Sequence, residues 1–164
     1  MSRFRIERTV ALPPAEVWRR LTDWPAHGAQ VPFTRTTVLT AGPNTVGTRF
    51  TARTGLGRLA FDDPMEVVVL EPPAPGRTGV CRLVKLGRVV LGSASFEVSG
   101  VADASGVAGA GASGVAGASG GSVGSRVVWV EELRLRGVPA AFDPVLALAG
   151  RVLFGRALDR LLRN

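Results

Sequence analysis

The sequence contains few of the residues that build disulfides and metal sites. Among its 164 residues there is one cysteine, Cys81, and one histidine, His27. A single cysteine excludes a disulfide within the chain, and a zinc site needs several cysteine or histidine ligands. We therefore expect no structural metal and no cofactor.

Long hydrophobic runs are also missing. No apolar stretch is long enough to span a bilayer. The first ten residues alternate charged with apolar side chains, a pattern that is typical of a strand and not of a signal peptide. These features favour a cytoplasmic protein without membrane insertion.

Lysine is nearly absent: Lys85 is the only one, and the other 19 of the 20 basic residues are arginine. A net charge of +7 would suit an anionic partner such as nucleic acid. The arginines are scattered, however, and no aromatic residues are interleaved with them for base stacking. The abundance of Arg, Ala, Gly, Val and Pro is typical of GC-rich codon usage. We expect no nucleic-acid partner.

The length suits one domain, 1–164, with a real core. Hydrophobic periodicity predicts first a strand and then a helix, with a possible second short helix, followed by six strands and a long final helix. The expected strands are 3–11, 34–40, 48–54, 58–71 with a break at Asp63-Pro64, 80–86, 89–98 and 126–136. The expected main helices are 14–24 and 142–164. Helices at both ends of a run of antiparallel hairpins predict an α+β fold.

The final helix has an apolar side built at spacings of three and four residues. This side includes Val145, Leu148, Ala149 and Val152. A strongly curved antiparallel sheet of about seven strands can wrap around such a helix and leave a cavity beneath it. We expect these side chains to form the roof of that cavity.

Four stretches, taken in this order, resemble the START-like superfamily, also called SRPBCC or helix-grip proteins, and in particular its bacterial polyketide cyclase/dehydrase-like branch. They are PAEVWRRLTDW (14–24), FDDPMEVVVLEPP (61–73), RVVWVEEL (126–133) and the terminal helix that begins at FDP. The resemblance implies a deep, largely apolar cavity for lipids, polyketides or other hydrophobic small molecules. Some members of the family catalyse cyclisation or dehydration, but no catalytic residue is shared across it.

The candidates for chemistry are Glu131, Arg8 and His27. Strand alternation places Glu131 on the apolar face beside Trp129 and Leu133, where burial would raise its pKa and suit a general acid or base. The structural alternative, which we favour, is an ion pair between Glu131 and Arg8, because the first and last strands of this fold are neighbours. His27 lies in the region after the first helix, either as a base at the cavity mouth or as a solvated loop residue.

The sequence therefore favours a non-catalytic binding protein for a hydrophobic small molecule, acting as a monomer or homodimer. An enzyme of the polyketide cyclase or aromatase type is the main alternative, and an interaction or chaperone-like module is a third. The expected cavity residues are Trp129, Glu131, Leu133, Phe50, Phe61, Val145, Leu148, Ala149 and Val152.

One segment differs in composition from the rest of the chain. Residues 100–125 are dominated by Gly, Ala and Ser, and ASGVAGA occurs at 104–110 and again at 112–118. Such a segment cannot bury enough apolar area to offset the entropy of ordering it, so we expect a disordered loop insertion.

We predict that a variant without this insertion folds like the full chain, because the segment adds no core. Circular dichroism and thermal unfolding of the two proteins would test this. Failure of the shortened protein to fold would show that the segment is structural.

Overall fold

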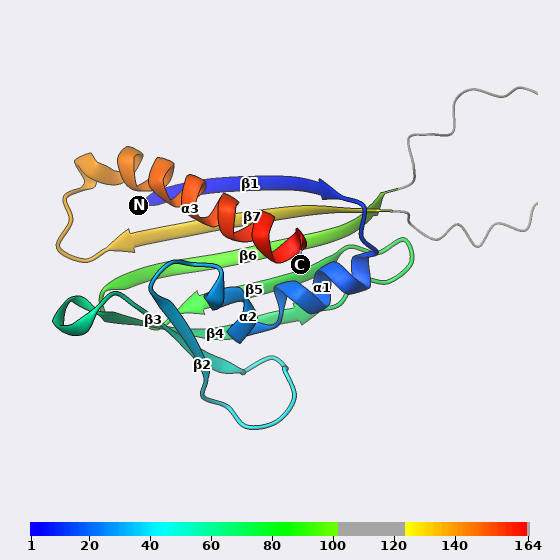
Figure 1. The fold of residues 1–164 in the computed structure, drawn as a ribbon, viewed down its shortest axis with the longest axis horizontal. Helices are drawn as coiled ribbons and strands as arrows, with labels where there is room; N and C mark the ends of the chain where they lie inside the picture. Colours follow the sequence, from blue (N-terminus) through cyan, green and yellow to red (C-terminus); the bar gives the residue numbers. More distant parts are fainter. Residues whose placement is uncertain (102–123, 164) are drawn as a thin grey trace, which may run out of the picture.

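The protein forms one curved antiparallel sheet with helices on its inner face (Figure 1). The structure is a computed structural model and describes residues 1–101 and 124–163. The seven strands are β1 (Ser2–Val10), β2 (Thr34–Val38), β3 (Arg49–Thr54), β4 (Phe61–Glu71), β5 (Gly79–Lys85), β6 (Val90–Val101) and β7 (Gly124–Leu135). The α-helices are α1 (Pro14–Leu21), α2 (Trp24–Ala29) and α3 (Asp143–Arg163), and the short 3-10 helices are η1 (Gly57–Leu59) and η2 (Ala140–Phe142). The predicted α+β helix-grip architecture is confirmed.

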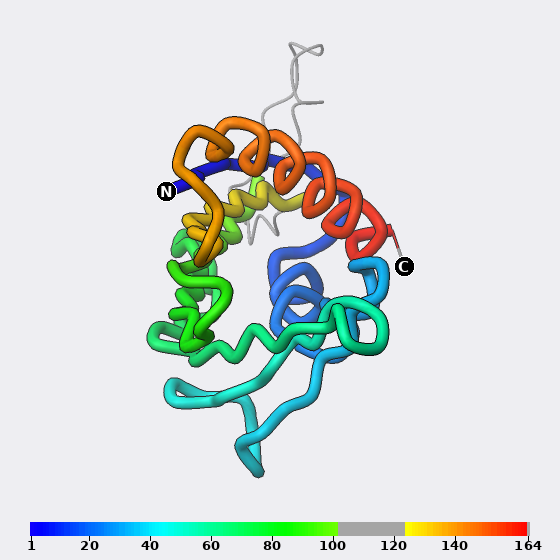
Figure 2. The backbone as a smooth tube through the Cα atoms, turned by 90° about the vertical axis from the view of Figure 1, so that its left-hand side faces the viewer, coloured from blue at the N-terminus to red at the C-terminus, as the bar shows by residue number. Residues whose placement is uncertain are grey.

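The sheet order is β1-β7-β6-β5-β4-β3-β2, so β1 and β2 are its two edges. Figure 2, viewed along the strands, shows the sheet curving from β1 round to β2, with the short helices inside the curve. Strand alternation sets the inner face, since successive side chains point to opposite sides. In β1, Phe4 and Ile6 are buried while Arg3 and Arg5 are exposed, as the sequence pattern predicts.

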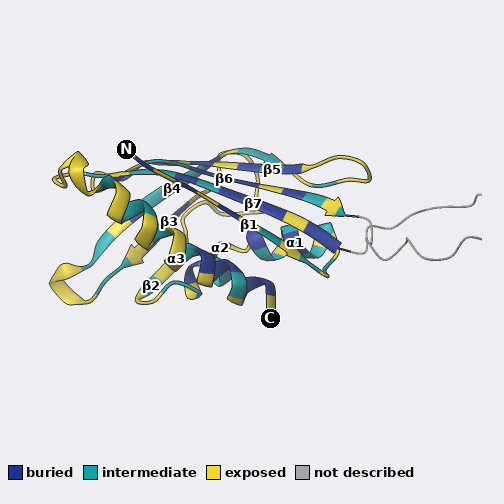
Figure 3. Cartoon of the chain, turned by 90° about the horizontal axis from the view of Figure 1, so that it is seen from above, coloured by how far each residue is buried: buried dark blue, intermediate teal, exposed yellow. Residues whose placement is uncertain are grey.

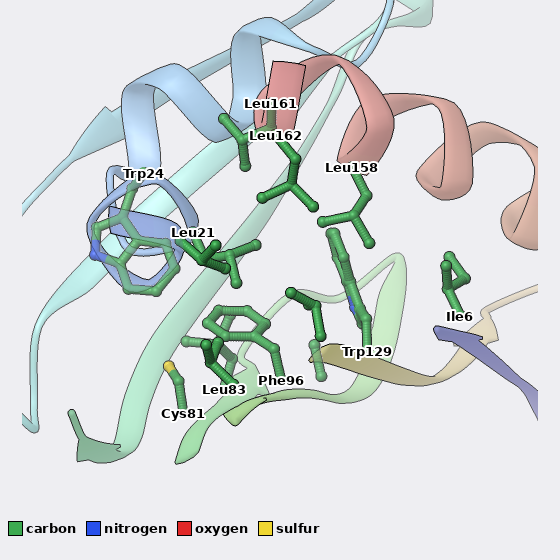
Figure 4. Close-up of a cluster of buried hydrophobic side chains, with 14 of the residues drawn as sticks. Ile6, Leu21, Trp24, Cys81, Leu83, Phe96, Trp129, Leu158, Leu161 and Leu162 are labelled. Atoms are coloured by element: carbon green, nitrogen blue, oxygen red, sulfur yellow. The ribbon is translucent and has the colours of Figure 1, made fainter. Parts of the chain in front are cut away.

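The core lies between the inner face of the sheet and the helices. Phe96 and Trp129 rise from the sheet, Leu21 comes from α1, and Leu158 and Leu161 come from the last turns of α3 (Figure 4). The rings of Phe96 and Trp129 meet edge to face with centroids 6.0 Å apart. Aromatic side chains bury large areas, so this cluster is the main apolar contact between the sheet and its helical cover.

Helix α3 packs along the β1 edge of the sheet, and its second half reaches α1 and α2. Figure 3 shows exposed residues in the first turns of α3 and buried ones toward its C-terminus. The structure here differs from the prediction: Val145, Leu148, Ala149 and Val152 are exposed. Leu148 and Val152 line only an open groove between α3 and β1. Near the edge the sheet covers only a narrow side of the helix, and helical periodicity cannot show how far a sheet extends beneath it.

Two predicted boundaries change. Strand β4 runs through Asp63-Pro64 without the expected break, because Pro64 still pairs with Thr51 of β3. Residues 100–101 belong to β6 and residues 124–125 to β7, so they are ordered parts of the sheet. The remainder of the expected insertion, 102–123, lies outside the described residues, and a deletion that tests it should stop at these limits.

We predict opposite effects for two glycine substitutions in α3. A Cβ on Gly150 would lie 2.5 Å from the ring of Phe4, whereas a Cβ on Gly155 would meet only the Arg8 guanidinium, at 3.3 Å. Phe4 is buried and stacks on Phe154, so it cannot move aside. Gly150→Ala should therefore lower stability, because overpacking costs about 1–3 kcal/mol. Gly155→Ala should raise stability by up to about 1 kcal/mol through helix propensity.

Urea unfolding of both variants would measure the difference. A gain of stability in Gly150→Ala would mean that α3 does not approach β1 closely.

Candidate functional site

A cavity of about 110 Å³ lies between the inner face of the sheet, α2 and α3. Its walls come from all of these elements. The lining residues are Trp24, His27, Gly28, Val31, Thr34, Thr36, Phe50, Ala52, Thr54, Asp63, Met65, Lys85, Ala94, Trp129, Glu131 and Phe154. Most of this surface is aromatic or aliphatic, which is usual for a small-molecule site.

Aromatic rings form the largest part of the wall. Trp24 of α2 stacks on Phe50 of β3, with ring centroids 4.4 Å apart and planes 10° from parallel. Trp129 of β7 lies 5.4 Å from Phe154 of α3. The Trp24 indole N–H donates to Asn44 Oδ1 at 3.1 Å. Asn44 does not line the cavity, so this bond fixes the ring from outside it. These contacts hold flat apolar surfaces around the empty volume.

The polar part of the wall is a buried cluster of three charged side chains. Lys85 Nζ lies 2.8 Å from Asp63 Oδ2 and 3.0 Å from Glu131 Oε1. The Trp129 indole N–H donates to the other Glu131 oxygen at 3.0 Å. The side chains of Lys85 and Glu131 are only 5% and 2% exposed, so these pairs act in a medium that screens charge weakly.

Small residues on the central strand make this cluster possible. Strand β6 separates β5 from β7, so the Lys85 side chain must cross it to reach Glu131. The β6 partner of Lys85 is Gly92, and the β6 partner of Glu131 is Ala94. Gly92 has a φ of +131°, and a Cβ on it would lie 1.9 Å from the Glu132 carbonyl oxygen. A larger residue at Gly92 would thus strain the strand in the very place that Lys85 crosses.

The pKa values follow from burial and from the three charges. Burial raises the pKa of Glu131, and the attraction of Lys85 and the Trp129 hydrogen bond offset this only in part. Burial by itself would lower the pKa of Lys85, but the charges of Glu131 and Asp63 outweigh it, so the pKa of Lys85 is raised. The ammonium is therefore the group that stays charged. Because burial outweighs this pairing, and the nearby charge of Asp63 adds to the effect, Glu131 takes up a proton more readily than an exposed glutamate does.

One oxygen of the cluster has no partner. Asp63 Oδ1 is buried and accepts no hydrogen bond from the described residues. An unpaired buried acceptor costs free energy, about 1–3 kcal/mol for a typical group. The cluster thus carries one more acceptor than its protein donors satisfy.

His27 enters the cavity from α2 and is half-buried. Its Nδ1 lies 3.2 Å from the Leu21 carbonyl oxygen, and its ring meets Trp129 edge-on at 4.8 Å. Burial lowers the pKa of His27, although the Leu21 carbonyl and the charge of Asp23 act in the other direction. His27 is thus a neutral, cavity-lining imidazole at pH 7 and not a solvated loop residue.

Arg8 takes no part in this cavity. Its guanidinium pairs with Asp159 of α3, with Nε 2.6 Å from Oδ1, in place of the expected ion pair with Glu131. Main-chain register explains the change: Arg8 is opposite Val127, whereas Glu131 is opposite Phe4, so the two lie far apart along the paired strands. Strand adjacency alone could not settle which residues meet.

Of the expected cavity residues, Trp129, Glu131 and Phe50 line the cavity. The structure places Leu133 and Phe61 outside its lining, like the four exposed residues of α3. From α3 only Phe154 reaches the cavity, because the sides of the helix that face the sheet carry Gly150, Phe154 and Leu158.

Sequence reasoning missed Lys85 and Asp63. A signal for Lys85 was present: it continues the alternation of Cys81 and Leu83, both buried, and it is the only lysine in an arginine-rich chain. Asp63 was hidden by the expected break at Asp63-Pro64. Cys81 itself is a small buried hydrophobe, and burial raises the pKa of its thiol to about 12.

The described residues contain no cluster of His, Cys, Asp or Glu that could hold a metal ion. Within the same ranges, none of the helices has the length and apolar character needed to cross a membrane.

Comparison with solved structures shows which proteins share this fold. No family model and no curated protein matches the chain. Among solved structures, that of Ara h 8.0201 is similar, with 13% identity and a TM-score of 0.55 over 99% of this chain and 98% of that one. The di-domain ARO/CYC BexL from the BE-7585A biosynthetic pathway is similar with 14% identity and a TM-score of 0.62, over 100% of this chain and 46% of that one.

The chain has the helix-grip fold. The resemblance predicted from the sequence is thereby confirmed at the level of the fold. Identities this low carry the architecture but not the activity, since one fold serves many functions. Evidence about a ligand must therefore come from the residues that line this cavity.

We predict that Lys85→Met destabilises the protein by about 3–5 kcal/mol at pH 7, because it leaves two buried carboxylates without a cation. The loss should shrink at pH 5, since burial raises the pKa of Glu131, and a carboxylate with a raised pKa in the folded state costs stability only above its unfolded pKa. Urea unfolding at both pH values would measure this. As a control, Arg53→Met removes one partner of the exposed Arg53–Asp62 pair and should cost about 1 kcal/mol or less. Equal losses in the two variants would contradict the buried cluster.

Proposed function

We propose that the protein binds an apolar small molecule in the cavity between the sheet, α2 and α3, and that it does so without catalysis. The observation that carries this proposal is a largely apolar wall, which includes the rings of Trp24, Phe50, Trp129 and Phe154, around an empty volume of about 110 Å³. Apolar ligands gain free energy by leaving water for such a surface, at roughly 25 cal/mol per Å².

The volume favours a compact ligand. An engineered apolar cavity of about 150 Å³ in another protein binds benzene. The present cavity is of the same order, so it suits a molecule of about one aromatic ring better than a whole lipid or polyketide chain. A longer ligand of that kind would require α2 and β2 to move apart, because Gly28 of α2 lies against Thr36 of β2.

The state of the polar groups supports binding over chemistry. The Lys85 ammonium is held by two carboxylates, so it is not a free amine nucleophile. Glu131 is occupied on both oxygens, by Lys85 and by Trp129. Both groups thus hold the walls of the site together.

A second candidate is acid–base catalysis on an apolar substrate in the same cavity, in the manner of a polyketide cyclase. One observation favours it: burial raises the pKa of Glu131 and lowers that of His27, and pairs of groups shifted in this way serve as acid and base in enzymes. Mass spectrometry of a co-purifying ligand, before and after prolonged incubation with fresh protein, separates the candidates. Unchanged ligand supports binding, and a product that Glu131→Gln does not form supports the enzyme.

We predict that toluene and indole raise the melting temperature of the protein in proportion to the logarithm of their concentration, as ligands of the native state do. Ala94 lines the cavity and is buried, so Ala94→Leu should fill the space and abolish the shift. Ala52→Leu fills the same cavity from β3 and should act alike. Ala149→Leu, on the exposed side of α3, is the matched control and should keep the full shift.

Differential scanning fluorimetry and isothermal titration would provide these values. Undiminished binding in both filled variants would place the ligand elsewhere and end the proposal.

A further inference from the structure

One polar group of the cavity wall, the imidazole of His27, is held in a fixed orientation and can accept a hydrogen bond. His27 is held on α2, whose first turn is capped by Asp23 accepting from the Ala26 N–H at 3.0 Å. The ring is fixed on one side by the Leu21 carbonyl and on another by the edge-on contact with Trp129. Its orientation is therefore set before any ligand enters.

The Leu21 contact decides where the imidazole proton lies. A carbonyl oxygen can only accept, so Nδ1, at 3.2 Å from it, must carry the hydrogen. In the neutral ring Nε2 then has a lone pair and no hydrogen. No donor among the described residues reaches Nε2.

Most other polar groups of the wall are engaged with protein atoms. Lys85 and Glu131 are bound within the charged cluster, and the hydroxyls of Thr34 and Thr54 lie 2.8 Å apart. The free oxygen of Asp63 is enclosed by protein. Since this cluster holds two carboxylates and one ammonium, it also disfavours an anionic ligand.

We propose that the ligand is a neutral aromatic molecule of about one ring that carries a hydroxyl or N–H donor, as phenols do, and that Nε2 of His27 accepts this hydrogen bond. The inference rests on the proposed binding function and names the chemical class of the ligand. A ring of the same size without a donor would fill the cavity but would displace water from Nε2 without replacing its hydrogen bond, which is unfavourable.

Three probes of similar size test the proposal on the full chain: phenol, which has a donor, and toluene and anisole, which have none. Titration calorimetry should give phenol about tenfold tighter binding than toluene or anisole, the factor expected for one hydrogen bond in a buried site. His27→Phe keeps a ring in place but removes the acceptor, so phenol should fall to the affinity of toluene while toluene is little affected. Gln30→Met, at the C-terminal end of the same helix and outside the cavity lining, is the matched control and should keep the preference.

The outcomes separate the two proposals. If toluene binds and phenol has no advantage, or if the phenol preference survives in His27→Phe, the assignment to His27 is wrong and the binding function stands. If none of the three probes binds, both the binding function and this inference are overturned.

A second measurement uses the unmodified protein, so it holds even if His27→Phe does not fold. His27 is the only histidine of the chain, and ring ¹⁵N resonances therefore report on this residue alone. Phenol should shift the Nε2 resonance toward the position of a hydrogen-bonded nitrogen, whereas toluene and anisole should leave it near its free value. The same response to all three probes would contradict the hydrogen bond.

Discussion

The ion cluster of Lys85, Asp63 and Glu131 is the constraint on which the interior depends. Lys85 of β5 contacts Asp63 of the neighbouring strand β4 and reaches past β6 to Glu131 of β7. The three charges lie on the mainly apolar inner face of the sheet. Removing charges from water is costly, and only mutual pairing with good geometry offsets that cost. The cluster therefore requires Gly92 and Ala94 to stay small, and the space above these small residues becomes part of the cavity.

The helices determine the shape of that cavity. Helix α3 follows the β1 edge, so its first turns leave apolar side chains in solvent and only Phe154 reaches the site. Helix α2 closes the opposite side with Trp24 and His27. The result is a small, aromatic-walled space with two kinds of polar group: a cluster satisfied largely from within, and one imidazole nitrogen that the described residues leave open.

This division of roles has a physical consequence for function. Groups that satisfy one another hold the wall rigid, and a rigid wall reduces the entropy lost on binding. In the proposed binding function, the open acceptor on His27 would provide selectivity, since a polar atom in a binding site disfavours any ligand that covers it without pairing with it. The curved sheet offers the space, and in this proposal a few side chains select the ligand.

Sequence patterns were sufficient for the architecture. Alternation in β1 and β7, the turn residues between strands and the periodicity of α3 predicted an α+β fold with a curved sheet and a long final helix, and the resemblance of four stretches added the helix-grip fold. Trp129, Glu131 and Phe50, which strand alternation placed on the inner face, line the cavity. These features are local, because the buried face of a strand or helix follows from the spacing of apolar residues along a short stretch of sequence. The partners within the site were not local. Lys85 and Asp63 stand 46 and 68 positions from Glu131 in the chain.

The sequence by itself therefore determined which elements form and which of their faces are apolar. Only the tertiary structure decided the register that pairs Glu131 with Lys85 and sends Arg8 to Asp159, the placement of α3 along the edge that exposes Val145 and Leu148, and the turn of His27 into the cavity. The physical reason is that periodicity records the side of an element that is buried. The distance between two side chains on different elements depends on the register and packing of the whole sheet.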